Sequence, residues 1–299
     1  MKAGKEMRTS KYQVFMRVVE EQSLTRAAEA LNYTQSGISH IIKNLEKELG
    51  CRLLIRSNVN FRLTPEGERL LEVIKSIANS EERLYQMADD IAGIRTGRIR
   101  IGTMCSVSTL WLPHIIRKYT EKHPQVQFDL RDADYESSER LLAEDLLDCA
   151  FLPKPRSGAL SHELLHMDRY YAVFPHGHPW CSLDRIPIGL FADETFIMPT
   201  EGMDYRLGDL FRQSDIKPRS FINVKDDFAT MSMVYAGLGV TILSKMFLDC
   251  FTPDIEIREL APETYRDLGF CLHKGREMAP ATAAFREFVF DWVRNATLG

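Results

Sequence analysis

Hydrophobic and polar positions repeat with a helical period between Ser23 and Glu46, and this pattern predicts two short helices joined by a tight turn. Ser23 can cap the first helix, and Asn32 tolerates the left-handed backbone that the turn needs. The first helix carries a small-residue face that lets a second helix approach closely: Ala27, Ala28, Ala30 and Leu31. Thr34 can cap the second helix, whose apolar stripe has i, i+3, i+4, i+7 spacing: Ile38, Ile41, Ile42 and Leu45.

The opposite face of the second helix is polar from its first turn. It carries groups that can donate to base edges and phosphates: Gln35, Ser36, Ser39, His40 and Lys43. A helix-turn-helix protein reads DNA with such a face at a helix N-terminus. The alternative is an ordinary helical hairpin with a solvated face, since two-helix pairs are common.

The segment that follows predicts two short strands. Leu49-Gly50 gives a helix stop, and the strands 51–56 and 60–64 flank a turn at 57–60. They would form a β-wing whose Arg52, Arg56 and Arg62 can meet the phosphate backbone. Thr64 then caps a helix with Pro65 at its first position.

Helix-turn-helix, wing and long exit helix in this order resemble the N-terminal domain of LysR-type transcriptional regulators. The residues that carry the resemblance are Ala27-Ala28-Glu29-Ala30-Leu31, Thr34-Gln35-Ser36, Ile38-Ser39, Leu45-Glu46, Leu49-Gly50, Leu53, Arg56 and Leu63-Thr64-Pro65-Glu66-Gly67. The resemblance implies that Gln35, Ser36, Ser39 and His40 face bases in double-stranded promoter DNA. The residues expected at phosphates are Arg26, Thr34, Lys43, Arg52, Arg56 and Arg62. His40 stands where many relatives have Arg, so affinity or base preference is expected to differ.

A candidate coiled coil follows the wing. Apolar residues at alternating three- and four-residue steps form its stripe, with Glu81 as the one polar interruption: Leu70, Ile74, Ile77, Leu84, Ala88 and Ile91. Such a stripe needs a partner helix, although it could also pack on its own domain. The LysR resemblance favours pairing between two chains, hence a homodimer or homotetramer. The expected domains are 1–66 (winged helix-turn-helix), 67–97 (linker helix and hinge) and 98–299 (effector-binding domain).

From Arg98 onward, strands and helices alternate, which predicts an α/β fold with mainly parallel sheets. This half is similar to the LysR effector domain and to type-2 periplasmic binding proteins, with two α/β lobes and a ligand cleft between them. Lobe I is expected at 98–169 and 270–299, and lobe II at 170–269. The matching residues are Ile99-Arg100-Ile101-Gly102, Leu112-Pro113, Leu147-Asp148, His178-Pro179 and Ala236-Gly237-Leu238-Gly239-Val240.

Ligands of open parallel sheets bind at the C-terminal ends of strands, close to helix N-termini. The candidate effector-binding residues are therefore Thr103, Ser106, Val107, Thr200, Glu201 and Phe228. The hydroxyl groups suit a carboxylate effector, whereas Glu201 and Asp204 would repel an anion, so the effector's charge stays open. Simple helix capping is the alternative for each Ser and Thr.

One motif points to an enzyme instead. His162-Glu163-Leu164-Leu165-His166 fits the H-E-x-x-H signature of zinc-dependent hydrolases, which must be helical to bring both histidines to one metal. Pro153, Pro155 and Gly158 precede it and a strand pattern follows, so an extended conformation is expected. No metal, cofactor or catalytic group is predicted.

The charge distribution agrees with a DNA-binding head. The chain of 299 residues has a net charge of −4, but residues 1–65 carry 11 Lys and Arg against 6 Asp and Glu, a net of +5. The remainder carries 27 against 36, a net of −9. No apolar run could span a bilayer and no signal sequence is recognisable, so a cytoplasmic regulator is favoured over a transport receptor. Six cysteines without clustering are expected to stay reduced, with Cys181 and Cys250 as the candidates for a redox switch.

Overall fold

The computed structural model describes residues 9–56, 61–91, 97–199, 205–224, 227–250 and 254–296. It divides into two compact units, Met1–Ala88 and Asp89–Gly299, each of which is described by itself. We call them the N-terminal and the C-terminal unit. The expected boundaries at residues 66 and 97 stay a prediction.

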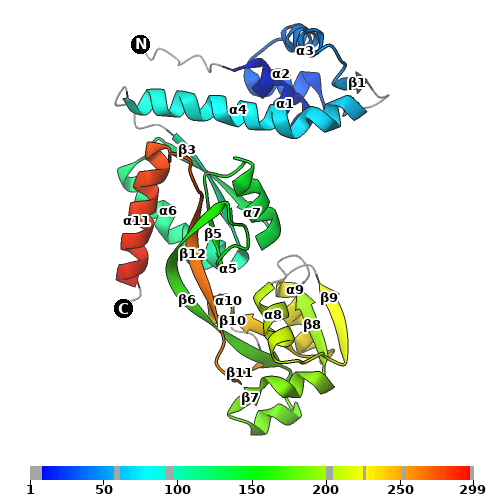
Figure 1. Ribbon diagram of the computed structural model, residues 1–299, viewed down its shortest axis with the longest axis vertical. Coiled ribbons are helices and arrows are strands. Elements are labelled where there is room, and N and C mark those ends of the chain that lie inside the picture. Colours follow the sequence, from blue (N-terminus) through cyan, green and yellow to red (C-terminus); the bar gives the residue numbers. More distant parts are fainter. Residues whose placement is uncertain are drawn as a thin grey trace. The chain divides into compact units, whose positions relative to one another are not determined.

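The N-terminal unit contains four helices and one hairpin in its described part (Figure 1). They are α1 (Lys11–Glu21), α2 (Leu24–Leu31), α3 (Gln35–Leu49), β1 (Leu54–Arg56), β2 (Phe61–Leu63) and α4 (Pro65–Ile91). The predicted caps are confirmed: the Ser23 hydroxyl accepts from Arg26 N–H, and the Thr34 hydroxyl accepts from Gly37 N–H. Asn32 ends α2 in the left-handed region at φ 56°. Local sequence signals therefore determine the two-helix turn.

The β1–β2 hairpin, which we call the wing, is fastened to its neighbours by polar contacts. Glu46 on α3 accepts hydrogen bonds from the backbone N–H of Leu53 and Leu54, at 2.8 and 3.1 Å. Thr64 donates to Arg52 O at 2.6 Å and accepts from Gly67 N–H at 2.9 Å, so it caps α4 as predicted. A Cβ on Gly67 would lie 2.3 Å from Leu53 O, so glycine allows this close approach. The predicted turn 57–60 lies outside the described residues.

The helix α4 divides its apolar residues between two roles. Leu70, Ile74 and Leu71 pack in the core of the N-terminal unit with Phe15, Ile38 and Leu45. Val73, which is not part of the predicted stripe, is 58% exposed, and the stripe residues Ile77 and Leu84 are 37% and 62% exposed. The intramolecular alternative is thus correct for the first part of the predicted stripe, whereas Ile77 and Leu84 are not covered by the N-terminal unit.

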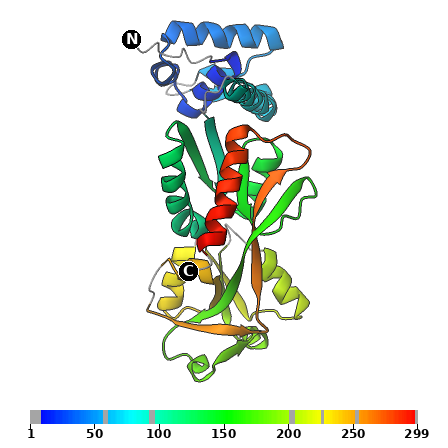
Figure 2. The same cartoon turned by 90° about the vertical axis from the view of Figure 1, so that its left-hand side faces the viewer.

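The C-terminal unit contains helices and strands in alternation (Figures 1 and 2). The elements of the first stretch are β3 (Gly97–Thr103), α5 (Cys105–Leu110), α6 (Leu112–Lys122), β4 (Val126–Asp132), α7 (Tyr135–Ala143), β5 (Cys149–Leu152) and β6 (Leu160–Phe174). The second stretch contains η1 (Pro179–Ser182), β7 (Arg185–Pro187), η2 (Ile188–Asp193), β8 (Thr195–Pro199), α8 (Tyr205–Gln213), β9 (Ser220–Val224) and α9 (Asp227–Tyr235). The last elements are β10 (Thr241–Ser244), α10 (Lys245–Leu248), β11 (Glu256–Ala261), β12 (Tyr265–His273) and α11 (Pro280–Ala296).

The α/β class is confirmed, but the strand pairing is mixed. The large sheet has the order β4-β3-β5-β12-β6-β11-β7, with β10 also paired to β6. Parallel pairs occur at β3–β4, β3–β5, β7–β11 and β8–β9, whereas β6 and β12 pair antiparallel with all their neighbours. The sequence predicted mainly parallel pairing, and the antiparallel pairing of the two long strands β6 and β12 differs from that prediction. Both views show them running from one lobe into the other (Figures 1 and 2).

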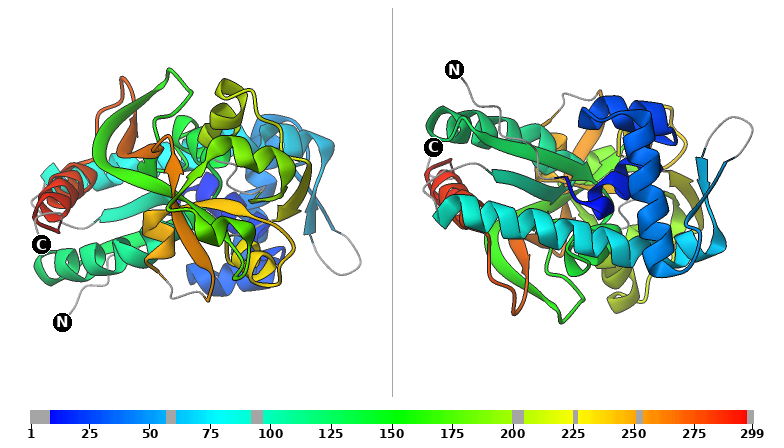
Figure 3. Two further views of the ribbon diagram at one scale, coloured as in Figure 1. Left: turned by 90° about the horizontal axis from the view of Figure 1, so that it is seen from below. Right: turned by 90° about the horizontal axis from the view of Figure 1, so that it is seen from above.

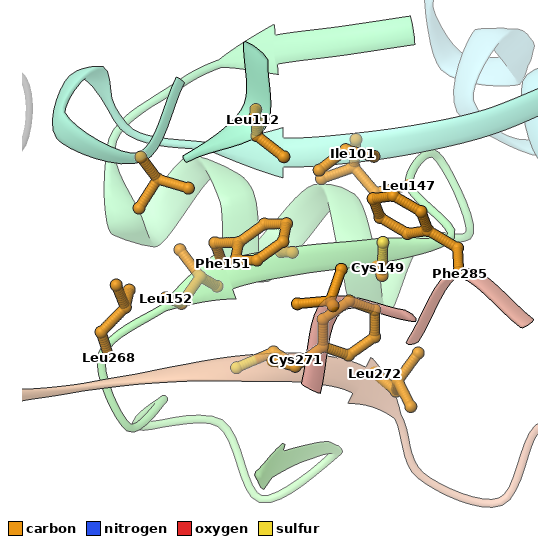
Figure 4. Close-up of a cluster of buried hydrophobic side chains, with 14 of the residues drawn as sticks. Ile101, Leu112, Leu147, Cys149, Phe151, Leu152, Leu268, Cys271, Leu272 and Phe285 are labelled. Carbon is orange, nitrogen blue, oxygen red and sulfur yellow. The ribbon is translucent and has the colours of Figure 1, made fainter. Parts of the chain in front are cut away.

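Each lobe has its own hydrophobic core. In lobe I, all four residues of β5 are buried, among them Phe151, which packs edge-on against Phe270 of β12 (Figure 4). The helices α11 and α6 contribute Phe285 and Leu112 to this core. Lobe II has two clusters, one around Trp180 and Phe191 and one around Phe247. The lobes are therefore separate packing units joined by β6 and β12.

Candidate DNA-binding and effector-binding sites

The exposed face of α3 is the candidate DNA-binding surface (Figure 3, right). Ile38, Ile42 and Leu45 are buried, and a helical repeat of 3.6 residues puts His40 on the opposite side. Gln35, Ser36, His40 and Lys43 are exposed, and Ser39 is half-buried. The predicted base-reading residues thus lie on one side of one helix.

The N-terminus of α3 has free backbone donors close to this face. Thr34 satisfies Gly37 N–H at 3.1 Å and lies 3.1 Å from the Ser36 hydroxyl. The unsatisfied N–H groups of a first helical turn, together with the helix dipole, attract phosphate oxygens. Thr34 therefore organises this turn as its cap, and a phosphate contact by its hydroxyl stays a prediction.

The basic residues flank the helix in different ways. Lys43, Arg52 and Arg62 are exposed. Arg26 donates to Glu21 O and pairs with the Glu21 carboxylate at 3.8 Å, so it also joins α2 to α1. Arg56 ends β1, and its side chain lies outside the described residues.

The predicted effector-binding residues separate into three groups. Thr103 and Ser106 are buried at the end of β3 and in α5, and Thr103 donates to Met104 O. Val107 is fully buried in the lobe I core, and its contact with an effector stays a prediction. Phe228, 45% exposed, lies at the start of α9 beside Phe247 of lobe II. Thr200 and Glu201 lie outside the described residues.

Ser106 belongs to a buried polar cluster that sequence reasoning missed. Asp168 on β6 and Arg266 on β12 are register partners and form an ion pair of 2.7 Å. The Arg266 guanidinium also donates to Ser106 Oγ at 2.8 Å and to Tyr135 Oη at 3.0 Å. Asp168 accepts from the backbone N–H of Met246 on α10, at 3.0 Å. We call these five residues the interlobe cluster, because α5 and α7 belong to lobe I and α10 to lobe II.

The interlobe cluster is built around a buried ion pair between Asp168 and Arg266. Asp168 is 0% and Arg266 5% exposed, and one negative charge balances one positive charge. Buried charges of this kind are tolerated only when they are paired and hydrogen-bonded. The sequence carried no distinct signal for this pair, because β6 also carries Glu163 and Arg169 and β12 carries Asp267 next to Arg266.

The zinc-hydrolase hypothesis is wrong for the signature at 162–166. These residues lie in the strand β6 and not in a helix, so His162 and His166 are separated by about 13 Å along the strand, which is too far to share one metal ion. His162 Nε2 lies 2.9 Å from Asp267 O, and Glu163 pairs with Arg286. In the described parts of the chain, no group of three His, Cys, Asp or Glu could hold a metal ion.

The two candidate redox cysteines lie in separate surroundings. Cys250 donates to Met246 O at 3.3 Å, and burial raises the pKa of its thiol to about 11. Cys181 packs at the edge of the core around Trp180.

The described helices include none with the length and apolar character to cross a membrane.

Comparisons with known proteins agree with both halves of the chain. The profile of the bacterial regulatory helix-turn-helix protein, lysR family, matches residues 9–68, and the LysR substrate binding domain matches residues 92–294. The transcriptional dual regulator GltC of Bacillus subtilis is 29% identical over 293 residues, covering 96% of this chain and 97% of GltC.

Solved structures share the fold. Full-length OxyR from Pseudomonas aeruginosa superposes with a TM-score of 0.70 at 23% identity, covering 96% of this chain and 95% of that one. CbnR, a structure complexed with its target DNA, gives 0.67 at 20% identity, covering 95% of this chain and 99% of that one. With two family profiles that together span most of its length, the chain belongs to the LysR family of bacterial transcriptional regulators.

Proposed function

We propose that the protein binds promoter DNA by inserting the exposed face of α3 into the major groove. The observation that carries this proposal is the continuous polar face from Gln35 to Lys43, which starts at a capped helix N-terminus and lies opposite the buried stripe. Gln35, Ser36 and His40 would read base edges, with Ser39 beside them. Amide, hydroxyl and imidazole groups are the donors and acceptors that such reading requires.

Phosphate contacts would fix the position of this helix. Arg52 just before β1, Arg62 in β2 and Lys43 on α3 are all exposed. Arg26, Thr34 and Arg56 complete the set that we propose at the backbone. The net charge of +5 over residues 1–65 supports attraction to DNA, while the acidic remainder limits it to this part of the chain. The cytoplasm is the compartment that this function implies.

Self-association would follow from the uncovered side of α4. Val73, Ile77 and Leu84 are apolar and exposed along this helix, and a helix with such a stripe gains stability by packing on another helix. Two copies of the chain related by a two-fold axis would then place two α3 helices on a near-palindromic site, with half-sites about one helical turn apart.

The lobes of the C-terminal unit would bind a small effector. Thr103 ends β3 and Ser106 lies in α5, so both offer hydroxyl groups at this strand end, while Asp168 already balances the neighbouring Arg266 charge. Hydroxyl groups can donate to a carboxylate, which is the effector class that we propose. Binding would shift the population between two lobe arrangements and so change the placement of the DNA-binding units.

Selection from a pool of randomised duplexes tests the proposal. We expect the full-length protein to enrich two inverted half-sites, and its affinity to fall steeply as salt is raised. Recovery of no common sequence at low salt would contradict DNA reading by α3. Recovery of a single half-site bound by one chain would contradict the proposed dimer alone.

A further inference from the structure

His40 has a neighbour on α3 that determines what it can offer to DNA. Asn44 follows His40 by one helical turn, and both side chains are exposed. The Asn44 amide nitrogen lies 3.2 Å from His40 Nδ1. Residues four apart face each other on a helix surface, so this contact does not depend on the rest of the fold.

The contact specifies the position of the imidazole proton. In the structure the Asn44 amide directs its nitrogen to Nδ1 of His40, and because an amide nitrogen can only donate, Nδ1 accepts in this arrangement. A neutral imidazole carries one proton, which then sits on Nε2. His40 therefore presents a hydrogen-bond donor at the tip of its ring. With the opposite tautomer the same ring would present an acceptor.

We propose that Asn44 is a positioning residue for base specificity, because it holds His40 as a donor toward an acceptor on a base edge. The acceptors in the major groove are O6 and N7 of guanine, N7 of adenine and O4 of thymine. Guanine offers two of them, so guanine is the base that we assign to His40. The inference rests on the proposed entry of α3 into the major groove.

The Asn44→Asp variant reverses the direction of the hydrogen bond between residue 44 and Nδ1 of His40. The introduced carboxylate can only accept, so it draws the single proton to Nδ1 and leaves Nε2 as an acceptor. The experiment is run at about pH 8.5, where histidine side chains in general are neutral. The base partner must then be a donor, which is the exocyclic amine of cytosine or adenine.

Selection from randomised duplexes is the readout. We expect the wild type to enrich guanine at one position of each half-site, and Asn44→Asp to enrich cytosine or adenine there. A single neutral hydrogen bond predicts a change on the order of fivefold in each preference. The new negative charge also weakens binding, but equally on all sequences.

Asn44→Asp combined with His40→Ala is the matched control. It keeps the added charge and removes the ring, so it must lose base preference at that position. Nitrogen NMR of labelled His40 in the free protein gives a second readout, with Nε2 protonated in the wild type and Nδ1 protonated in Asn44→Asp.

The proposal is overturned if Asn44→Asp enriches the same base as the wild type, or if the wild-type spectrum shows a proton on Nδ1. Failure of the wild type to select any sequence would instead refute the proposed function, and the NMR measurement would still decide the tautomer. The two claims can therefore fail separately.

Discussion

Asp168→Asn is the most severe test of the interlobe cluster, because the buried Asp168 accepts two hydrogen bonds and makes an ion-pair contact with a third nitrogen. Its carboxylate receives Arg266 Nε and Nη2 on one oxygen, at 2.8 and 2.7 Å, and Met246 N–H on the other, at 3.0 Å. An asparagine amide has one oxygen, so it can serve only one of these two sides. Its NH₂ group then faces a donor, and the Arg266 charge loses its counter-ion.

The expected loss is large. Removing one partner of a buried ion pair costs about 3–5 kcal/mol, a substantial fraction of the roughly 5–15 kcal/mol that stabilises a domain. For a domain of about 200 residues this corresponds to a fall in Tm of about 6–20 °C. Asp168 is 0% exposed, so water cannot replace the missing acceptor.

Urea unfolding of the full chain followed by tryptophan fluorescence measures the effect. The three tryptophans are Trp111, Trp180 and Trp292, and all lie in the C-terminal unit, so unfolding of the N-terminal unit gives no signal. The free energy of unfolding comes from linear extrapolation to zero urea.

Asp129→Asn is the matched control, because it makes the same change in a more exposed pair with Arg98 at 2.8 Å. Its cost is expected to stay below about 1 kcal/mol. Replacing both members, Asp168→Leu with Arg266→Met, should recover most of the loss since no buried charge remains. The reasoning is refuted if Asp168→Asn costs no more than Asp129→Asn, or if the double replacement is as unstable as Asp168→Asn.

Four other outcomes follow from the same structure. Gln35→Ala should cost about 1–3 kcal/mol on the selected duplex and change the preference at one base, with random duplex bound as before. Arg62→Ala should weaken binding on every duplex and lower the salt slope by about 1, as measured by fluorescence anisotropy; equal behaviour of these two variants would contradict the division of roles. Hydrogen bonds from the His176 ring to the Asp254 and Glu256 carboxylates raise the pKa of His176, so its stabilising contribution is present below about pH 6.5 and is lost as pH rises through the raised value. Unfolding midpoints of wild type and His176→Gln should therefore converge at high pH, and a constant difference would disprove this. With a thiol pKa raised from 9.0 to about 11, Cys250 should react with iodoacetamide roughly 100-fold more slowly at about pH 7 than an ordinary thiol, and rapid labelling would count against its burial.

The N-terminal unit could be predicted from sequence because its signals are local. Ser23 and Thr34 cap backbone groups three residues away, and Asn32 adopts the positive φ for which its residue type is suited. The polar face of α3 follows from the same helical period that buries Ile38 and Leu45. A pattern read over 24 residues therefore located the proposed DNA-binding surface.

The lobes were harder to predict because their contacts are distant in sequence. Asp168 and Arg266 are 98 residues apart, and no local pattern indicates that β12 inserts between β5 and β6. The same insertion makes the sheet mixed, against the parallel pairing that strand–helix alternation favours. The signature at His162 matched a zinc site by residue type alone, whereas an extended strand separates its two histidines by about 13 Å.

The structure of the full-length protein bound to a selected duplex tests the central claim most directly. We predict that α3 lies in the major groove, with Gln35, Ser36 and His40 within hydrogen-bonding distance of base edges and Arg62 at a phosphate. A complex in which this face of α3 points away from the duplex, with another surface on the DNA, would contradict the account.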